Sequence, residues 1–321
     1  MAVYVNTNYS ALQGQRYLGN VQNQLTTTYQ RLSSGMRINS AKDDAAGLQI
    51  ADRLTSQING LNQGNRNASD GIALAQTAEA GMDEISGMLQ KIRTLAVQAN
   101  NGTNTLEDRK SLAKEASALA TEVTRIAQQT TFAGKTILNG KQANSIDPLP
   151  GAGAPPGAPG GNAGADQNIT LQVGSNKGDT ITFALVNLQF SASGKAAGIA
   201  DAQFQNNALG TAAFLVKNSE VTVNFSTIGA VSNIINYMDQ MISYVDGKRA
   251  DLGATQNRLE SSIRNQSNVA ANEADARSRI RDADFAEESA NLSQQSIIQQ
   301  AAASMLMQAN TRPQLGLSLL G

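Results

Sequence analysis

Apolar side chains recur every seven residues along two long stretches of this chain. In the first stretch one position stays apolar without interruption, through Leu54, Leu61, Ala68, Ala75, Met82, Leu89 and Ala96. A companion position is held by Ile58 and Ile72 and, after a small shift of phase, by Ala78, Ile85, Ile92 and Ala99. Two apolar positions in a sustained period of seven predict a helix of a left-handed coiled coil. At ~1.5 Å per residue, a helix over residues 44–100 would be about 85 Å long.

The second stretch lies near the C-terminus and has the same spacing. Its first position is held by Val231, Met238, Val245, Leu252 and Leu259, and its companion by Ile235, Ile242 and Ile263. Arg249 and Gln256 interrupt the companion row, and polar seam positions fix the register of a coiled coil at some cost in stability. Between the two stretches a shorter helix carries Leu112, Leu119, Val123 and Ile126. The alternative is an ordinary amphipathic helix on a globular core, but such helices span only ~8 to 20 residues.

The middle of the chain changes to a period of two. Residues 168–185 and 213–225 each contain two alternating runs around a polar turn, which predicts two β-hairpins. Proline, which breaks helices, is concentrated just before them, at Pro148, Pro150, Pro155, Pro156 and Pro159. This Pro/Gly-rich stretch is typical of a linker. The predicted fold is therefore mainly α, with long antiparallel coiled-coil arms from the N- and C-terminal regions and a small β-rich central module.

The two ends of the chain carry thinner apolar stripes. They consist of Leu18, Val21, Leu25, Tyr29 and Leu32 at one end and of Ile298, Ala302, Met305 and Ala309 at the other. Helices with so little apolar surface are marginal without partners, so we expect both ends to order on assembly. Membrane-surface helices are the competing interpretation, but these polar faces lack the expected excess of Lys and Arg.

Composition excludes several classes of function. The 25 basic and 26 acidic residues balance, so no basic surplus indicates nucleic acid. Without Cys or His the chain has no disulfide, thiolate nucleophile, zinc finger or histidine relay. We expect no enzyme activity, cofactor or metal. The N-terminus does not resemble a cleaved secretory signal, and no stretch approaches the roughly 18 to 20 apolar residues of a membrane span.

Two adjacent acids, Asp43 and Asp44, stand where the first long helix begins. Asn39 and Ser40 are candidates for its N-cap, which would place both acids in the first helical turn, where the helix dipole favours negative charge. A metal site would need further ligands, which this segment lacks. The other arm brings Arg277, Arg279 and Arg281 to a similar break in its pattern. We predict that the two acids pair with these arginines, within one subunit or across to the next.

Six segments at the two ends resemble the terminal signatures of bacterial flagellin, in the family's order. They are "NTNYSAL", "LSSGMRINSAKDDAAGLQIADRL", "FAGKTILNG", "DLGATQNRLESSI", "ARSRIRDADFAEES" and "QANTRPQLGLSLL". The resemblance covers roughly residues 1–140 and 230–321. It implies a structural subunit that polymerises into the extracellular flagellar filament for swimming motility. A hook–filament junction protein, which has similar termini, is the alternative. Some flagellins carry a protease, but its zinc motif needs histidine.

The resemblance also implies a domain plan and partners. Residues 1–43 with 281–321 would form an inner terminal coiled coil, and residues 44–145 with 228–280 a helical shell with a hairpin near 168–186. Residues 146–227 would form a variable, outward-facing region. Subunits of this family are exported unfolded, without a cleaved signal, by the flagellar type III apparatus and a chaperone. They fold under a filament cap and follow a junction protein.

A further implied partner is a host Toll-like receptor, whose site resembles "LQKIRTLAVQAN" in this chain. Leu95 and Gln98 match the family pattern, and Glu115 resembles the contacting acid on the second helix. Lys91 replaces the family's arginine, which loses a bidentate contact. The alternative for these residues is a solvated stripe with one core leucine. Leu317, Leu319 and Leu320 resemble terminal leucines that a cytosolic receptor reads, although packing in the filament would be their first role.

Overall fold

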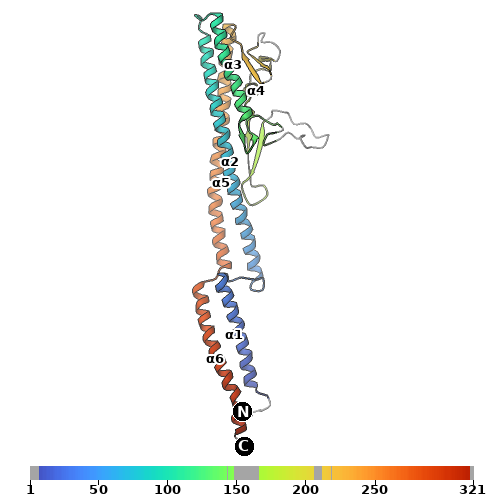
Figure 1. Ribbon diagram of the computed structural model, residues 1–321, viewed down its shortest axis with the longest axis vertical. Helices are drawn as coiled ribbons and strands as arrows, with labels where there is room; N and C mark the ends of the chain where they lie inside the picture. The colour runs from blue at the N-terminus through green and yellow to red at the C-terminus, as the bar shows by residue number, and fades with distance from the viewer. Residues whose placement is uncertain (1–6, 143, 148–165, 206–211, 218, 319–321) are drawn as a thin grey trace, which may run out of the picture. The chain divides into compact units, whose positions relative to one another are not determined.

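The computed structural model (Figure 1) describes residues 7–142, 144–147, 166–205, 212–217 and 219–318, with side chains to residue 311. Six α-helices occur in these ranges: α1 (Tyr9–Ser34), α2 (Ala45–Ala99), α3 (Leu106–Gln129), α4 (Phe190–Ala196), α5 (Ile228–Arg281) and α6 (Phe285–Ser318). The strands are short: β1 (Thr131–Phe132), β2 (Lys135–Thr136), β3 (Gln167–Gln172), β4 (Thr180–Leu185), β5 (Phe204–Gln205), β6 (Phe214–Lys217) and β7 (Glu220–Val223). None of the helices described is long and apolar enough to cross a membrane.

Two compact units make up the chain. Residues 1–59 and 268–321 form the terminal unit, and residues 60–267 form the bundle unit. Helices α2 and α5 contribute residues to both. The fold class predicted from the heptad pattern, helical arms with a small β module, is confirmed.

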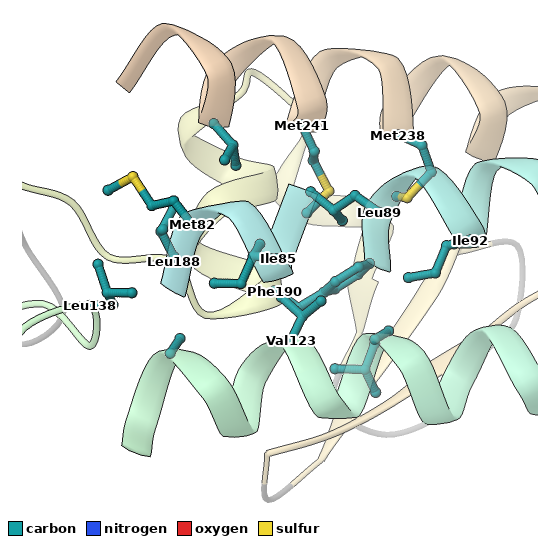
Figure 2. Close-up of a cluster of buried hydrophobic side chains, with 14 of the residues drawn as sticks. Met82, Ile85, Leu89, Ile92, Val123, Leu138, Leu188, Phe190, Met238 and Met241 are labelled. Atoms are coloured by element: carbon teal, nitrogen blue, oxygen red, sulfur yellow. The ribbon is translucent and has the colours of Figure 1, made fainter. Parts of the chain in front are cut away.

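The bundle unit has one main hydrophobic core shared by α2, α3 and α5. Figure 2 shows Met238 and Met241 of α5 directed at α2, whose Met82, Ile85, Leu89 and Ile92 lie between α5 and α3. The uninterrupted apolar position of α2 is buried from Leu61 to Ala96, and that of α5 from Val231 to Leu259. The period of seven therefore marks the packed faces of both helices.

Polar contacts run alongside this apolar seam between α2 and α5. They join Glu79 to Gln256 (3.0 Å), Asp83 to Arg249 (2.9 Å), Ser86 to Asp246 (3.4 Å) and Arg93 to Asp239 (2.5 Å). From Asp83 to Arg93 each step forward along α2 is matched by an equal step back along α5, so the last three contacts belong to one register. Several seam residues of α2 are alanines, which by themselves distinguish one register from another only weakly. Of the two residues that interrupt the heptads, Arg249 therefore makes a contact specific to this register, and Gln256 adds a separate polar contact to Glu79.

The described residues of the central segment belong to this bundle. Strands β5, β6 and β7 form one sheet, with β5 parallel to β6 and β6 antiparallel to β7. Phe214 of β6 contacts Phe190 of α4, Phe204 of β5 and Tyr237 of α5, with ring centroids 5.1, 5.2 and 6.2 Å apart. All four aromatic side chains pack in or against the main core. The resemblance implies a variable, outward-facing region over 146–227, and most of the buried apolar residues described in this segment belong to the core that it shares with the helices.

Helix α3 covers the free edge of this sheet. The hydroxyl of Thr121 accepts a hydrogen bond from Val221 N–H (3.0 Å), and that of Ser117 accepts one from Val223 N–H (2.8 Å). The two hydroxyls are one helical turn apart along α3. This spacing is close to the distance along β7 between the two residues whose N–H groups donate to them. The edge of β7 is thus occupied from within the chain, which blocks pairing with a strand of another molecule.

The hairpin of β3 and β4 packs on glycines of α2. Its strands pair from Gln167 with Leu185 to Gln172 with Thr180. A Cβ added at Gly64 would lie 2.7 Å from the carbonyl carbon of Val173 and closer still to its oxygen. Beside it, the amide of Asn67 donates to the carbonyl of Gln172 (2.9 Å). The helix and the hairpin can approach this closely because residue 64 has no side chain.

Candidate assembly surface

The terminal unit contains an antiparallel pair of helices, α1 and α6, which lie side by side in Figure 1. Three polar contacts tie the pair along its length. Asn8 Nδ2 donates to the carbonyl of Ala309 (2.8 Å), Thr28 Oγ1 to Gln295 Oε1 (3.1 Å), and Arg31 Nη1 to Glu288 Oε1 (3.1 Å). Asn8 also caps α1 by accepting from Ala11 N–H (3.0 Å), which satisfies one of the unpaired donors at the helix start.

The apolar seam of this pair is thin. Among the described side chains of α1 and α6, only Val21 and Ala302 are buried apolar residues, whereas Leu18, Leu25, Leu32 and Ile298 are half-buried. Large apolar side chains are exposed elsewhere on the same two helices, namely Tyr9, Leu12, Tyr17, Tyr29, Phe285, Ile297, Met305 and Met307. Two helices that bury so little and expose so much apolar surface are expected to bury it against another molecule.

A groove of about 970 Å³ runs between the two helices. One wall comes from α1 and includes Gly14 and Tyr17, and the other comes from α6 and includes Ile298, Ala302 and Met305. Gly14 faces Leu306, since a Cβ there would lie 3.2 Å from Leu306 Cδ1. The groove is therefore of mixed character: apolar side chains, with Tyr17 and Met305 exposed, alternate with the polar Ser10, Gln13, Gln308 and Thr311.

Two residues of the predicted terminal stripes lie outside the seam. Tyr29 is exposed because Thr28 holds the buried position next to it, and Met305 is 68% exposed because Leu306 turns toward α1. In each case the true seam runs one residue away from the predicted stripe. The predicted stripes did not include six exposed residues of the same helices, Tyr9, Leu12, Tyr17, Phe285, Ile297 and Met307. Large apolar residues beside a thin stripe could have indicated them.

A joint connects the ends of four helices in the terminal unit. Gly35 ends α1 in the left-handed region with φ 71°, where glycine is favoured. Its carbonyl accepts from Ala283 N–H (3.0 Å), and the carbonyl of Arg281 accepts from the N–H groups of Arg37 (2.7 Å) and Ile38 (3.3 Å). The break between α1 and α2 is thus hydrogen-bonded to the break between α5 and α6.

Asp44 caps the start of α2 and Asp43 binds the turn before it, so neither acid lies in the first turn of the helix. Asp43 Oδ2 accepts from the backbone N–H groups of Ser40 (2.9 Å) and Asn39 (3.1 Å), and these bonds lower the pKa of its carboxyl. Asp44 stands just before Ala45 and accepts from Gly47 N–H (2.9 Å). Asn39 and Ser40 are therefore donors to Asp43 and not the N-cap, because Asp44 holds the N-cap position directly before Ala45.

The predicted pairing of these acids with the arginines within one subunit is wrong for the residues that the structure describes. Arg279 pairs with Asp275 one turn earlier (3.0 Å), and Arg277 donates to Thr55 Oγ1 (3.4 Å). Arg281 contributes its backbone carbonyl to the joint. Backbone donors already satisfy the two carboxylates locally, so inside the chain they have little need of a cationic partner.

The other predicted site residues lie apart from this surface or outside the described side chains. Lys91, Gln98 and Glu115 are exposed, and Leu95 is half-buried against the main core. Lys91, Leu95 and Gln98 share one face of α2, at steps of four and three residues. The side chain of Leu317 and all of Leu319 and Leu320 lie outside the described part. Within that part, no three acids gather as a metal site would require.

Comparison with known proteins places this architecture in a family. The model of the bacterial flagellin N-terminal helical region matches residues 5–143, and that of the bacterial flagellin C-terminal helical region matches residues 235–320. By fold, the chain resembles a putative flagellar hook-associated protein from Vibrio parahaemolyticus, with a TM-score of 0.53 and 16% identity. That alignment covers 75% of this chain and all of the other. At this identity it shows the fold alone.

Full-length relatives carry the flagellin name. The chain is 36% identical to polar flagellin C of Vibrio parahaemolyticus serotype O3:K6 and 37% identical to flagellin A of Vibrio cholerae serotype O1. Both alignments cover 100% of each chain. The family is one of structural proteins that build a filament outside the cell. The chain therefore belongs to the bacterial flagellins, and it is a structural subunit of the flagellar filament.

Proposed function

We propose that the exposed apolar surface of α1 and α6 is where one subunit binds the next during polymerisation. One observation carries this proposal: eight of the thirteen exposed large apolar residues in the described part lie on these two helices. Burial of apolar area contributes about 25 cal/mol per Å². The surface that contributes most to association is thus the one that the isolated subunit leaves uncovered.

The arrangement suits a filament because it need not close on itself. A contact between different patches of identical subunits continues indefinitely when its rotation does not form a ring. The groove between α1 and α6 and the residues on the outer sides of the helices are different patches. The bundle unit, with its own core, would stay folded whether or not they are occupied.

Truncation tests this proposal. A variant lacking residues 1–40 and 285–321 should keep the helical circular dichroism and cooperative melting of the bundle unit but form no filaments by electron microscopy. A finer pair of full-length variants is Tyr17→Gln and Gln13→Ala, both within the groove. Only Tyr17→Gln should raise the critical concentration, because Gln13 contributes no large apolar group. Filaments from the truncated chain would refute the proposal.

The acids and arginines at the joint are proposed to pair between neighbouring subunits. Arg279 and both acids are exposed, so their charges remain accessible to another copy. In the double variant Asp43→Asn with Asp44→Asn, each amide oxygen can still accept the backbone hydrogen bonds, but the negative charge is gone. This variant therefore tests the ion pairing separately from the backbone hydrogen bonds. Assembly should weaken in this variant without loss of helix. Lys at both positions should weaken it further, with partial rescue by Glu at Arg279. Normal assembly of the Asn variant would reject the pairing.

The proposed route to the filament is export of the unfolded subunit. The proposed partners on this route are the chaperone, the export apparatus, the filament cap and the junction protein. The thin seam of α1 and α6 supports it, since these helices cost little to unfold. Amide exchange in the monomer should be much faster in α1 and α6 than in the α2 core. Addition of the chaperone should slow exchange in α6. Equal exchange in all helices would contradict this.

Recognition by a host Toll-like receptor is proposed for the exposed residues of α2 and α3. Lys91, Gln98 and Glu115 offer polar contacts, and Leu95 is only partly available because it packs on the core. Lys91→Arg should strengthen signalling in receptor-expressing reporter cells, because guanidinium can bind a carboxylate in bidentate fashion. Lys110→Arg, on α3, is the matched control. No gain from Lys91→Arg would count against this site.

A further inference from the structure

Two of the methionines that the structure describes differ from the rest in exposure. Met82, Met238 and Met241 are buried in the main core, and Met36 and Met88 are half-buried. Met305 and Met307 are 68% and 65% exposed, both on α6. The chain has no cysteine. In the described part, these two thioethers are therefore the sulfur atoms most open to an oxidant in solution.

The two exposed methionines occupy different sides of α6. Met305 lines the groove between α1 and α6, together with Tyr17 and Ile298. Met307 follows two residues later, about 200° further around the helix, and does not line the groove. Exposure is nearly equal at the two positions, so an oxidant should reach them equally well. Their consequences for assembly should differ, because only one lies in the groove.

We propose that Met305 is a modification site through which peroxide lowers the ability of the free subunit to polymerise. This inference rests on the proposed role of the groove as a binding surface for a second copy of the chain. Oxidation would act before assembly and not after it, since a neighbouring subunit in the groove would cover the sulfur. The filament would then be resistant and the free subunit sensitive.

The chemistry needs only hydrogen peroxide. The thioether sulfur attacks one peroxide oxygen, an S–O bond forms and the O–O bond breaks. The second oxygen leaves as water with both protons, so methionine is oxidised to the sulfoxide and peroxide is reduced. The sulfoxide is a polar hydrogen-bond acceptor in place of a flexible apolar group. In the groove the sulfoxide would replace an apolar contact with a group that must lose its water on association, and this opposes association even though Gln13 and Gln308 lie in the same lining. Methionine sulfoxide reductases reverse the modification.

Peroxide treatment of subunits and filaments tests the proposal. Full-length subunits released from filaments by heat, and intact filaments, are exposed to dilute hydrogen peroxide, and oxidation at each methionine is measured by peptide mass spectrometry. The critical concentration for polymerisation of the treated subunits is then measured by sedimentation. We expect a rise of about tenfold, the factor that corresponds to 1.4 kcal/mol. A reductase should restore the original value.

Matched variants assign the effect to one residue. Leucine conserves volume, so Met305→Leu and Met307→Leu should both polymerise untreated. After peroxide, Met305→Leu should keep its critical concentration within about twofold, whereas Met307→Leu should lose affinity like the wild type. As a check without oxidant, Met305→Gln should raise the critical concentration more than Met307→Gln, because only Met305 lines the groove. A Met305→Leu subunit as sensitive as the wild type would overturn the inference.

Two failures can be told apart. If Met305 is protected in filaments but its oxidation in subunits leaves polymerisation unchanged, the modification proposal fails and the groove remains an interface. If Met305 oxidises equally fast in filaments and subunits, the groove is not covered by a neighbour. In that case the proposed function of the groove fails as well.

Discussion

Gly64 of α2 offers a sharp test of how the hairpin is held. In Gly64→Ala the new Cβ would lie 2.7 Å from the carbonyl carbon of Val173 and closer to its oxygen. Both atoms are backbone, so no rotamer change relieves the clash, and β3 must move away from α2. The hydrogen bond from Asn67 to Gln172 (2.9 Å) would be strained or lost with it. Overpacking of this kind costs about 1–3 kcal/mol, and a lost hydrogen bond about 1 kcal/mol more.

Gly87 provides the matched control on the same helix. It is exposed, and a Cβ there would meet nothing within 4 Å. Gly87→Ala should therefore stabilise the protein by about 1 kcal/mol through helix propensity alone. The same gain offsets part of the clash at Gly64, so we expect a net loss of about 1–3 kcal/mol there.

Urea unfolding of the monomer, followed by circular dichroism, measures the difference between the two variants. Amide exchange localises it: protection should fall in β3 and β4 of Gly64→Ala and be unchanged in α3. If Gly64→Ala were stabilised as much as Gly87→Ala, close backbone approach at this position would be refuted.

Three further predictions concern the capping, the seam and pH. Asp44→Ala should cost about 1 kcal/mol in urea unfolding and Asp44→Asn almost nothing, because only alanine removes the cap of α2. A double-mutant cycle on Asp83 and Arg249 should give a coupling free energy of unfolding of about 0.2–1 kcal/mol, since both side chains are partly exposed. A coupling of zero would show that this contact does not help to fix the register. Burial, and then the Asp166 carboxylate, raise the pKa of Tyr244 from 10.0 to about 12. The folded state therefore retains this phenol proton longer than the unfolded chain, and stability should fall as pH rises from 10.0 to about 12. Tyr244→Phe should remove that part of the fall in denaturant midpoint.

The heptads predict the packed faces of α2 and α5 because both helices are buried along one side over many turns. The terminal helices were harder to predict for the opposite reason. Their seam is so thin that a stripe drawn one residue away, through Tyr29 and Met305, fits the sequence equally well. The seam positions are held in part by Thr28 and Glu288, whose polarity hides them from an apolar pattern.

The central segment could be predicted only as strands. Its hairpins are local and follow from alternation, but its packing depends on Phe190, Phe204 and Tyr237, which come from three elements and meet at Phe214. Nothing in their spacing indicates such a contact. The start of α2 was similarly hidden, because Asn39, Ser40, Asp43 and Asp44 are all good capping residues. Only the geometry shows that the aspartates accept the bonds.

The measurement that tests the assembly surface most directly uses a single introduced thiol. Because the chain contains no cysteine, Tyr17→Cys creates its only thiol, in the groove between α1 and α6. A small fraction of this variant is copolymerised with wild-type subunits, and its rate of maleimide labelling is compared in subunits, in filaments and in filaments melted back to subunits. We predict labelling at least about tenfold slower in filaments, with full recovery on melting. Labelling that is equally fast in filaments and in subunits would contradict the account.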